Sequence, residues 1–379
     1  MLSLTYKLAL RLLAVVLPVV AVALLAVALL RTESSAIQRF ELPPLTTDIG
    51  FQKPAEAVRV RQRLRGYVFG RSGLPRGLPA VERGITDPPF TLGLTNLSRV
   101  DRLTVSMPLG FRSVAYHVVP RRGNGGLLVY HNGHKQGLAY GKPTVAHFLD
   151  RGYALLVLAM PFAAYNTNPD EVDTPCGRVE MKDGGDWRHH DSMACLPFAF
   201  RYFLEPVAVA LNYISRFGYR VTAMTGLSGG GWTTVIYAAL DPRVQRSYPV
   251  AGSQPHDLTD RLCPSDNPLV LTTCFGDLEQ RSPGFYRITN YYELYTLGGW
   301  GRGRKQLAIH NVYDRCCFAG RHYREWTPRV QAALRRLGTG TYSALGDSTH
   351  QGHLVSAFTL RVIEKDLEQT LVRTRSDGG

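Results

Sequence analysis

The strongest constraint on the fold is an alternation of strand-like and helix-like segments that begins near residue 101. Continuous apolar runs at 127–133 and 153–161 predict strands buried on both faces, which parallel sheets contain. Alternating strands and helices predict a parallel sheet with helices on both faces. Two long irregular stretches, 162–195 and 254–305, interrupt the pattern, and loops of this length in a compact domain are usually functional.

The expected strands are 102–107, 111–120, 127–133, 153–161, 219–228, 246–253, 305–314 and 341–347. The expected helices are 143–152, 197–218, 230–242, 324–338 and a last helix that begins near residue 354.

The segment Gly226-Leu227-Ser228-Gly229-Gly230 lies between an expected strand and an expected helix. It fits G-x-S-x-G in the strand–turn–helix setting of a nucleophile elbow. Glycine tolerates the unusual dihedrals and the close packing of such a turn. The alternative is a glycine-rich turn with an idle serine, and the context favours Ser228 as a nucleophile.

A serine nucleophile needs a base, and the base needs an orienting acid. In this architecture both follow the serine, in the order acid then histidine, at the ends of later strands. Asp314 ends one such strand and is the expected acid. His353 and His350 both follow the last strand, and we favour His353 because it lies just before the last helix. Asp347 is the alternative acid, but it follows the wrong strand.

An oxyanion hole needs two donors. The backbone N–H groups of Gly229, directly after the nucleophile, and of His134, on the loop after an earlier strand, are the expected pair. His131 and His134 are weak candidates for metal ligands, because two histidines on one loop are a small part of a metal site. The histidine-containing segment 183–191 is expected to be a solvated loop. This chemistry requires no cofactor and no metal.

At this point the chain resembles the α/β-hydrolase superfamily over about residues 100–375. The resemblance implies an α/β-hydrolase fold with a mostly parallel, eight-stranded sheet, here within a catalytic domain of residues 101–379. It also implies a cap-like insertion after the sixth strand, which residues 254–305 would provide. The aromatic side chains of that segment either line an acyl or sugar site or pack the insertion onto the core, as most such residues do.

The N-terminal segment has a different character. Nineteen uncharged apolar residues, 12–30, are long enough for a membrane-spanning helix. Residues 1–36 are therefore expected to be a membrane anchor, or a secretion signal if the chain is cleaved near Ser34-Ser35-Ala36. Residues 37–100, rich in Arg, Pro and Gly, are expected to form a stalk and a wrap-around segment.

Six cysteines behind an apparent export segment indicate disulfides and an oxidising compartment. Cys176 and Cys195 would close a local loop. Cys316 and Cys317 are adjacent and are expected to reach two different partners, with positions 263 and 274 as candidates. This pattern predicts an extracytoplasmic protein, either membrane-anchored or secreted.

The net charge of +14 favours contact with anionic membranes, polysaccharides or nucleic acid. No nucleic-acid-binding motif accompanies the charge, so we expect no nucleic-acid partner. Arginines alternate along residues 59–65, which is typical of a solvated edge strand; a patch that contacts anionic lipid is the alternative.

Together these features predict a serine hydrolase that cleaves a carboxylic ester, either a small molecule or a polysaccharide ester. An amidase, peptidase or acyltransferase on the same scaffold is the alternative, because the three catalytic groups do not choose the leaving group. A binding module that has lost its chemistry is a third hypothesis. The sequence does not define the oligomeric state.

Overall fold

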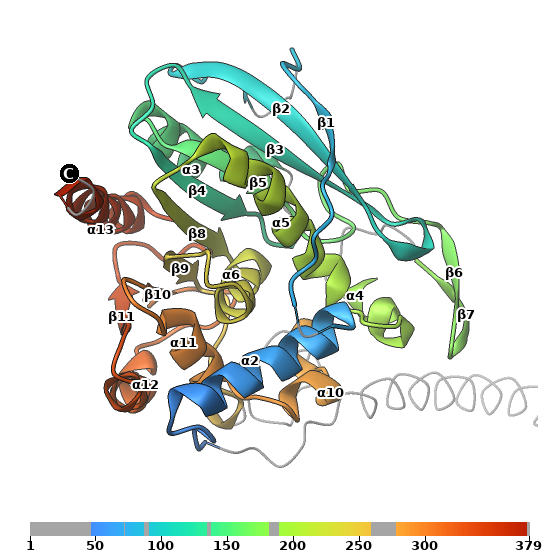
Figure 1. Ribbon diagram of the computed structural model, residues 1–379, viewed down its shortest axis with the longest axis vertical. Helices are drawn as coiled ribbons and strands as arrows, with labels where there is room; N and C mark the ends of the chain where they lie inside the picture. Colours follow the sequence, from blue (N-terminus) through green and yellow to red (C-terminus); the bar gives the residue numbers. More distant parts are fainter. Residues whose placement is uncertain are drawn as a thin grey trace, which may run out of the picture. The chain divides into compact units, whose positions relative to one another are not determined.

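The computed structural model describes residues 47–71, 73–86, 91–134, 138–181, 189–258 and 278–376. A nine-stranded sheet runs through this part of the chain in the order β1-β2-β3-β5-β4-β8-β9-β10-β11 (Figure 1). Its strands are β1 (Ala80–Glu82), β2 (Leu97–Ser106), β3 (Arg112–Pro120), β4 (Gly126–His131), β5 (Ala154–Leu158), β8 (Val221–Leu227), β9 (Arg246–Val250), β10 (Lys305–Asn311) and β11 (Thr341–Asp347).

The sheet is parallel where the apolar runs predict it. Strands β5, β4, β8, β9, β10 and β11 pair in parallel, whereas β1, β2 and β3 pair antiparallel at one edge, and β3 pairs antiparallel with β5. All residues of β4, β5 and β9 are buried, because helices cover both faces. The short edge strand β1 was not expected, and it brings the sheet from the predicted eight strands to nine.

Helices form two layers around the sheet. One layer contains α3 and α13, whose apolar residues join the strands in one core cluster. In the other layer, α6 packs on β8 and β9 and is itself covered by α2, α5 and α11, while α12 packs on β11. The bounds are α2 (Pro54–Phe69), α3 (Leu138–Asp150), α5 (Arg201–Ile214), α6 (Gly229–Leu240), α11 (Tyr291–Gly299), α12 (Tyr323–Leu337) and α13 (Ala357–Ser376).

Shorter elements lie in the irregular stretches. They are the hairpin β6 (Glu171–Thr174) and β7 (Gly177–Glu180), and the helical turns η2 (Pro108–Gly110), α4 (His189–Ser192), η3 (Met193–Cys195), η4 (Ser215–Phe217), α9 (Leu278–Arg281) and α10 (Pro283–Tyr286). Within the segment expected to be a cap, α11 is buried throughout and packs on α6 and α12. Its Tyr295 stacks on Trp326 and Tyr342, so these aromatic residues pack the core.

The arginine-rich segment is a helix, and the edge-strand interpretation was wrong. Pro54 occupies the first turn of α2, and the Glu56 carboxylate accepts the N–H groups of Gln52 and Lys53. Arg61 and Arg65, four residues apart, therefore lie on one helical face and donate to main-chain oxygens at the end of α6. The described residues from 47 onward form one compact unit, which includes α2.

The membrane expectation needs correction. No helix within the described ranges is long and apolar enough to cross a membrane. The 20-residue helix α13 has sufficient length, but charged residues such as Arg361, Glu364 and Lys365 recur along it. Segment 12–30, on which the prediction rested, lies outside the described residues.

The cysteines follow the prediction only in part. Cys176, at the turn of the β6–β7 hairpin, is bonded to Cys195 as expected. Cys316 and Cys317 are bonded to each other, so the expectation of two different partners was wrong. The Asp314 carboxylate accepts the Cys316 N–H two residues on, and this Asx-type turn bends the chain where the two cysteines lie. Positions 263 and 274 lie outside the described residues.

Candidate active site

Ser228 lies at the junction of β8 and α6. Its backbone has φ 58° and ψ −125°, a left-handed conformation that a residue with a Cβ rarely adopts. Strain of this kind costs on the order of 1–3 kcal/mol and persists where the surrounding structure imposes it. Here the Ser228 N–H donates to Val250 O of β9, and Ser228 O accepts the Trp232 N–H of α6. The turn presents the half-buried hydroxyl at the carboxyl end of the sheet.

Two glycines make this turn possible. A Cβ on Gly226 would lie 2.4 Å from Gly230 O, and a Cβ on Gly230 would lie 2.0 Å from His131 O at the end of β4. Neither position therefore accepts a side chain, as the G-x-S-x-G pattern predicts. Gly229 is the first residue of α6, so its N–H has no acceptor within the helix and lies beside Ser228.

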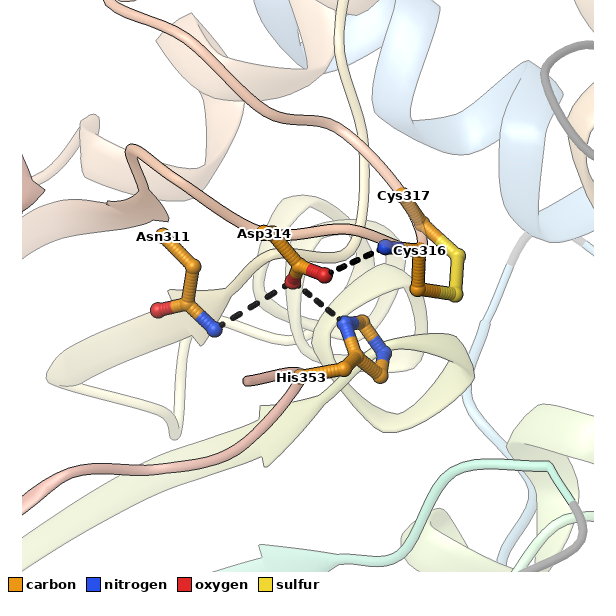
Figure 2. The surroundings of a disulfide bond; sticks show 5 residues. All are labelled: Asn311, Asp314, Cys316, Cys317 and His353. Carbon is orange, nitrogen blue, oxygen red and sulfur yellow. Dashed lines mark hydrogen bonds and ion pairs between the residues drawn. A yellow bond between two sulfur atoms is a disulfide. The ribbon is translucent and has the colours of Figure 1, made fainter. Parts of the chain in front are cut away.

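Asp314 and His353 come together beyond the ends of β10 and β11. His353 Nδ1 and Asp314 Oδ2 are 2.6 Å apart, and the other carboxylate oxygen accepts the Cys316 N–H at 2.8 Å. Figure 2 shows these contacts together with a longer one, at 3.4 Å, from the Asn311 side-chain amide. The Nδ1–H of His353 is thereby fixed on the carboxylate side, which leaves Nε2 as the nitrogen able to take a proton.

These donors keep Asp314 ionised. Burial alone raises the pKa of the Asp314 carboxyl, because it penalises the charged form. The hydrogen bond and the charge of His353, with the donors of Cys316 and Asn311, outweigh burial and lower the pKa below 3.8. A carboxylate that is charged at neutral pH stabilises the imidazolium that forms when a histidine acts as a base.

The alternative pair, His350 and Asp347, has a different arrangement. His350 Nε2 lies 3.4 Å from Asp347 Oδ2 and makes no hydrogen bond with it. Asp347 is buried, and the hydroxyls of Thr349, Ser356 and Thr359 are bonded to its carboxylate. Its acceptor positions are used to hold the start of α13, so the geometry favours Asp314 and His353.

The structure does not complete the triad with a hydrogen bond. Within the described part of the chain, His353 Nε2 has no hydrogen-bond partner and no bond joins it to Ser228. The backbone nevertheless brings Ser228 and His353 to the same edge of the sheet. Ala251 N–H, just after β9, donates to Ile309 O of β10. Asn311, at the end of β10, donates to Leu354 O, next to His353. In the apo form of such sites the base and nucleophile are often too far apart for a hydrogen bond.

The expected oxyanion loop lies against the elbow. A Cβ on Gly133 would be 2.6 Å from Leu227 O and 3.1 Å from Ser228 Cβ, so the two backbones are in contact. The His134 ring lies over Gly229, with Cε1 2.7 Å from the place of a Gly229 Cβ. The His131 ring contacts the chain next to it: it is buried, its Nδ1 lies 3.0 Å from Asn132 O, and burial lowers its pKa to about 4.

Two residues that the sequence did not single out as functional join His134. His190, from the segment expected to be a solvated loop, is 2% exposed, so that expectation was wrong for this residue. Its Nδ1 lies 2.6 Å from Glu279 Oε1, and His134 Nε2 lies 2.8 Å from the same oxygen. Both come from the two long irregular stretches, and the length of those stretches was the only sequence signal.

No protein-family model and no curated protein matches this sequence. Solved structures are similar to it. An acetyl xylan esterase from Paenibacillus sp. R4 is 15% identical, with TM-score 0.54, and the match covers 88% of this chain and 98% of that one. Acetyl xylan esterase 1 from Thermoanaerobacterium sp. JW/SL YS485 is 13% identical, with TM-score 0.53, covering 90% and 98%. The chain therefore has the α/β-hydrolase fold, as the sequence resemblance implied.

Proposed function

We propose that this protein is a serine hydrolase that cleaves carboxylic esters. The observation that carries the proposal is the 2.6 Å contact between His353 and Asp314 at the same sheet edge as Ser228, whose backbone is held at a strained elbow. A glycine-rich turn without a catalytic role would not explain why a histidine and a carboxylate are oriented toward each other beyond the ends of β10 and β11. The chain order Ser228, Asp314, His353 also supports the proposal, because nucleophile, acid and base follow in this order along an α/β-hydrolase chain.

In the proposed reaction, Ser228 Oγ attacks the ester carbonyl carbon while His353 Nε2 takes the hydroxyl proton. Asp314 stabilises the resulting imidazolium, and the N–H groups of Gly229 and His134 bind the carbonyl oxygen as it becomes negative. The C–O bond to the alcohol then breaks, and His353 returns its proton to the leaving oxygen. Water, activated by the same histidine, hydrolyses the acyl-enzyme and restores the serine.

The substrate class rests on the names of the similar solved structures. Both solved structures reported above carry the name acetyl xylan esterase, which favours a short acyl group on a sugar hydroxyl. We extend the proposal to esters of this kind, as small molecules or polysaccharides. We also propose a compartment outside the cytoplasm, because the Cys176–Cys195 disulfide is of a kind that persists in oxidising environments.

A fluorophosphonate probe, which reacts with activated serines, tests the proposal. The purified full chain should be labelled, and its Ser228→Ala variant should not. Turnover of acetyl esters should then exceed turnover of the matched anilides and of long-chain esters. A folded wild-type chain that takes up no probe would contradict the serine mechanism. Labelling with turnover confined to amides would keep the mechanism and overturn the ester assignment.

A further inference from the structure

We propose that His134, His190 and Glu279 form a binding site for a divalent transition-metal ion, zinc above all, beside the nucleophile elbow. One ligand atom from each residue, His134 Nε2, His190 Nδ1 and a Glu279 carboxylate oxygen, lies within 4.8 Å of the other two. Two imidazoles and one carboxylate are the ligand set of several catalytic zinc sites, which keep their remaining position open. The inference concerns metal binding and does not depend on the hydrolase reaction.

The distances suit a small ion. The two imidazole nitrogens are 3.2 Å apart, and they lie 2.8 and 2.6 Å from Glu279 Oε1. Ligand atoms around a tetrahedral zinc with bonds of about 2.0–2.1 Å are separated by roughly 3.3 Å. The nitrogens already have this spacing, and the carboxylate oxygen, now 2.6–2.8 Å from them, has to withdraw by roughly 0.5–0.7 Å to admit the ion.

The outer contacts of His190 are those of a metal ligand. Its Nε2 lies 3.0 Å from Pro161 O, and a carbonyl oxygen only accepts, so Nε2 carries a proton. Ligating histidines usually donate their second N–H in this way, which orients the ring and directs the lone pair of the other nitrogen to the ion. Phe162 and Phe203 pack against the ring and hold it in an apolar wall.

The three ligand atoms converge on one buried spot. His134 Nε2 and His190 Nδ1 lie 3.2 Å apart, and both contact Glu279 Oε1, at a site where His190 is 2% and Glu279 1% exposed. A divalent cation at this spot would be bound by the lone pairs of all three atoms, because metal ligands of these types bind in their deprotonated forms.

The surrounding structure fixes the two segments that supply the buried ligands. Asp191, next to His190, accepts the N–H of Leu278, next to Glu279, at 2.9 Å. Tyr286 donates to the main-chain oxygen of Glu279 at 2.6 Å. These two bonds hold the backbone at Glu279, and the backbone in turn positions the carboxylate. His134 connects this site to Gly229, since Nε2 belongs to the cluster and Cε1 lies against the elbow.

Metal binding by the full chain provides the test. The chain is stripped with a chelator, the disulfides are left oxidised, and Zn²⁺ is titrated by calorimetry. Co²⁺ then serves as a spectroscopic probe, because four- or five-coordinate cobalt absorbs visible light far more strongly than the hydrated ion. We expect one ion per chain, release of protons on binding, and the strong visible absorption.

His190→Ala and Glu279→Gln should each weaken binding by more than about 100-fold, because even the loss of an outer-shell partner costs about 10–100-fold. The matched control is His147→Gln, which removes a histidine paired with Glu364 at 3.0 Å in a group that has no third ligand among the described residues. It should bind as the wild type does. Near-UV circular dichroism reports folding, and Glu279→Gln keeps the size of the side chain if His190→Ala unfolds.

Two results would overturn the inference. One is a wild-type chain that binds zinc no more tightly than a folded Glu279→Gln variant. The other is cobalt that retains the spectrum of its hydrated ion. In either case the three side chains form a hydrogen-bonded cluster that holds the loop of His134 in place.

Discussion

Replacement of Asp314 by asparagine tests the proposed mechanism at its most specific contact. Oδ1 of the carboxylate accepts the Cys316 N–H, and Oδ2 faces Nδ1 of His353. An asparagine has one oxygen and one amino group for these two positions. If the oxygen keeps the Cys316 bond, the amino group faces His353 and forces its proton onto Nε2, where it blocks the uptake of the serine proton.

The magnitude follows from the two orientations. Turning the amide restores the useful tautomer but sets a donor against the Cys316 N–H, which costs about 1–3 kcal/mol. The charge-assisted bond to the imidazolium is lost as well, at about 1.5–3 kcal/mol. Together these terms raise the barrier by roughly 2.5–6 kcal/mol, so kcat/KM should fall by roughly 10²–10⁴-fold.

The assay is kcat/KM with a chromogenic acetyl ester, with the rate of fluorophosphonate labelling measured in parallel. Asp347→Asn is the matched control, because Asp347 ends the neighbouring strand β11 and its carboxylate is bonded to Thr349, Ser356 and Thr359. It should lower stability and leave the rate per folded molecule nearly unchanged. An Asp314→Asn enzyme within about tenfold of wild type, a barrier change of about 1.4 kcal/mol, would refute the assignment of the acid.

Three further predictions concern stability. Gly230→Ala should cost at least about 3 kcal/mol of unfolding free energy in urea titrations, because its Cβ would lie 2.0 Å from the main-chain oxygen at the end of β4. Gly66→Ala, in α2 with open space around it, should be neutral or stabilising, and an equal loss in both would contradict this reasoning. Replacing both Cys176 and Cys195 by serine should cost about 3 kcal/mol, because the bond closes a loop between residues 19 apart; an unchanged urea midpoint would count against it. Burial raises the pKa of Asp347, but its hydroxyl and amide donors outweigh burial and lower it below 3.8. A carboxyl group whose pKa is lower in the folded than in the unfolded state stabilises the fold at pH values above its ordinary pKa. This stabilisation is lost as pH falls through the folded-state pKa. The difference in thermal midpoint between wild type and Asp347→Asn should therefore be full above about pH 5 and shrink progressively as pH falls below that. A constant difference would show that the charge is not responsible.

The sheet and the elbow were predictable because their physics is local. A strand covered on both faces has to be apolar throughout, and the runs around Leu128 and Leu156 satisfy this without knowledge of their neighbours. The prediction of Asp314 and His353 used one further rule, that the carboxyl ends of parallel strands meet at one edge. The choice between His353 and His350 rested on the distance to the last helix alone; it stays a prediction, which the hydroxyl contacts of Asp347 support.

The helix α2 was missed although it carries local signals. Pro54 and Glu56 mark a helix start, but the alternating arginines that follow imitate the period of a strand. Arg61 and Arg65 are also four residues apart, which is a helical spacing. Only their acceptors, carbonyl groups of α6 about 175 residues further along the chain, show that the helical spacing and not the alternation applies. Likewise, His190 and Glu279 lie in segments without periodicity, so no pattern brings them together.

The arginines also change the meaning of the net charge of +14. Every residue of α6 is buried, so its last carbonyl groups have neither helical partners nor water. Arg304 donates to Ala238 O, Arg61 to Ala239 O and Arg65 to Leu240 O, at 2.6–2.9 Å.

Burial lowers the pKa of Arg61 to about 9 and that of Arg304 to about 10, yet both remain charged at neutral pH. Cations at the carboxyl end of a helix favourably oppose its dipole. Part of the positive charge therefore stabilises the helix whose first N–H, at Gly229, lies beside Ser228, rather than an anionic surface. The net charge counted from the sequence includes these buried guanidinium groups. It therefore overstates how strongly the protein attracts anionic surfaces.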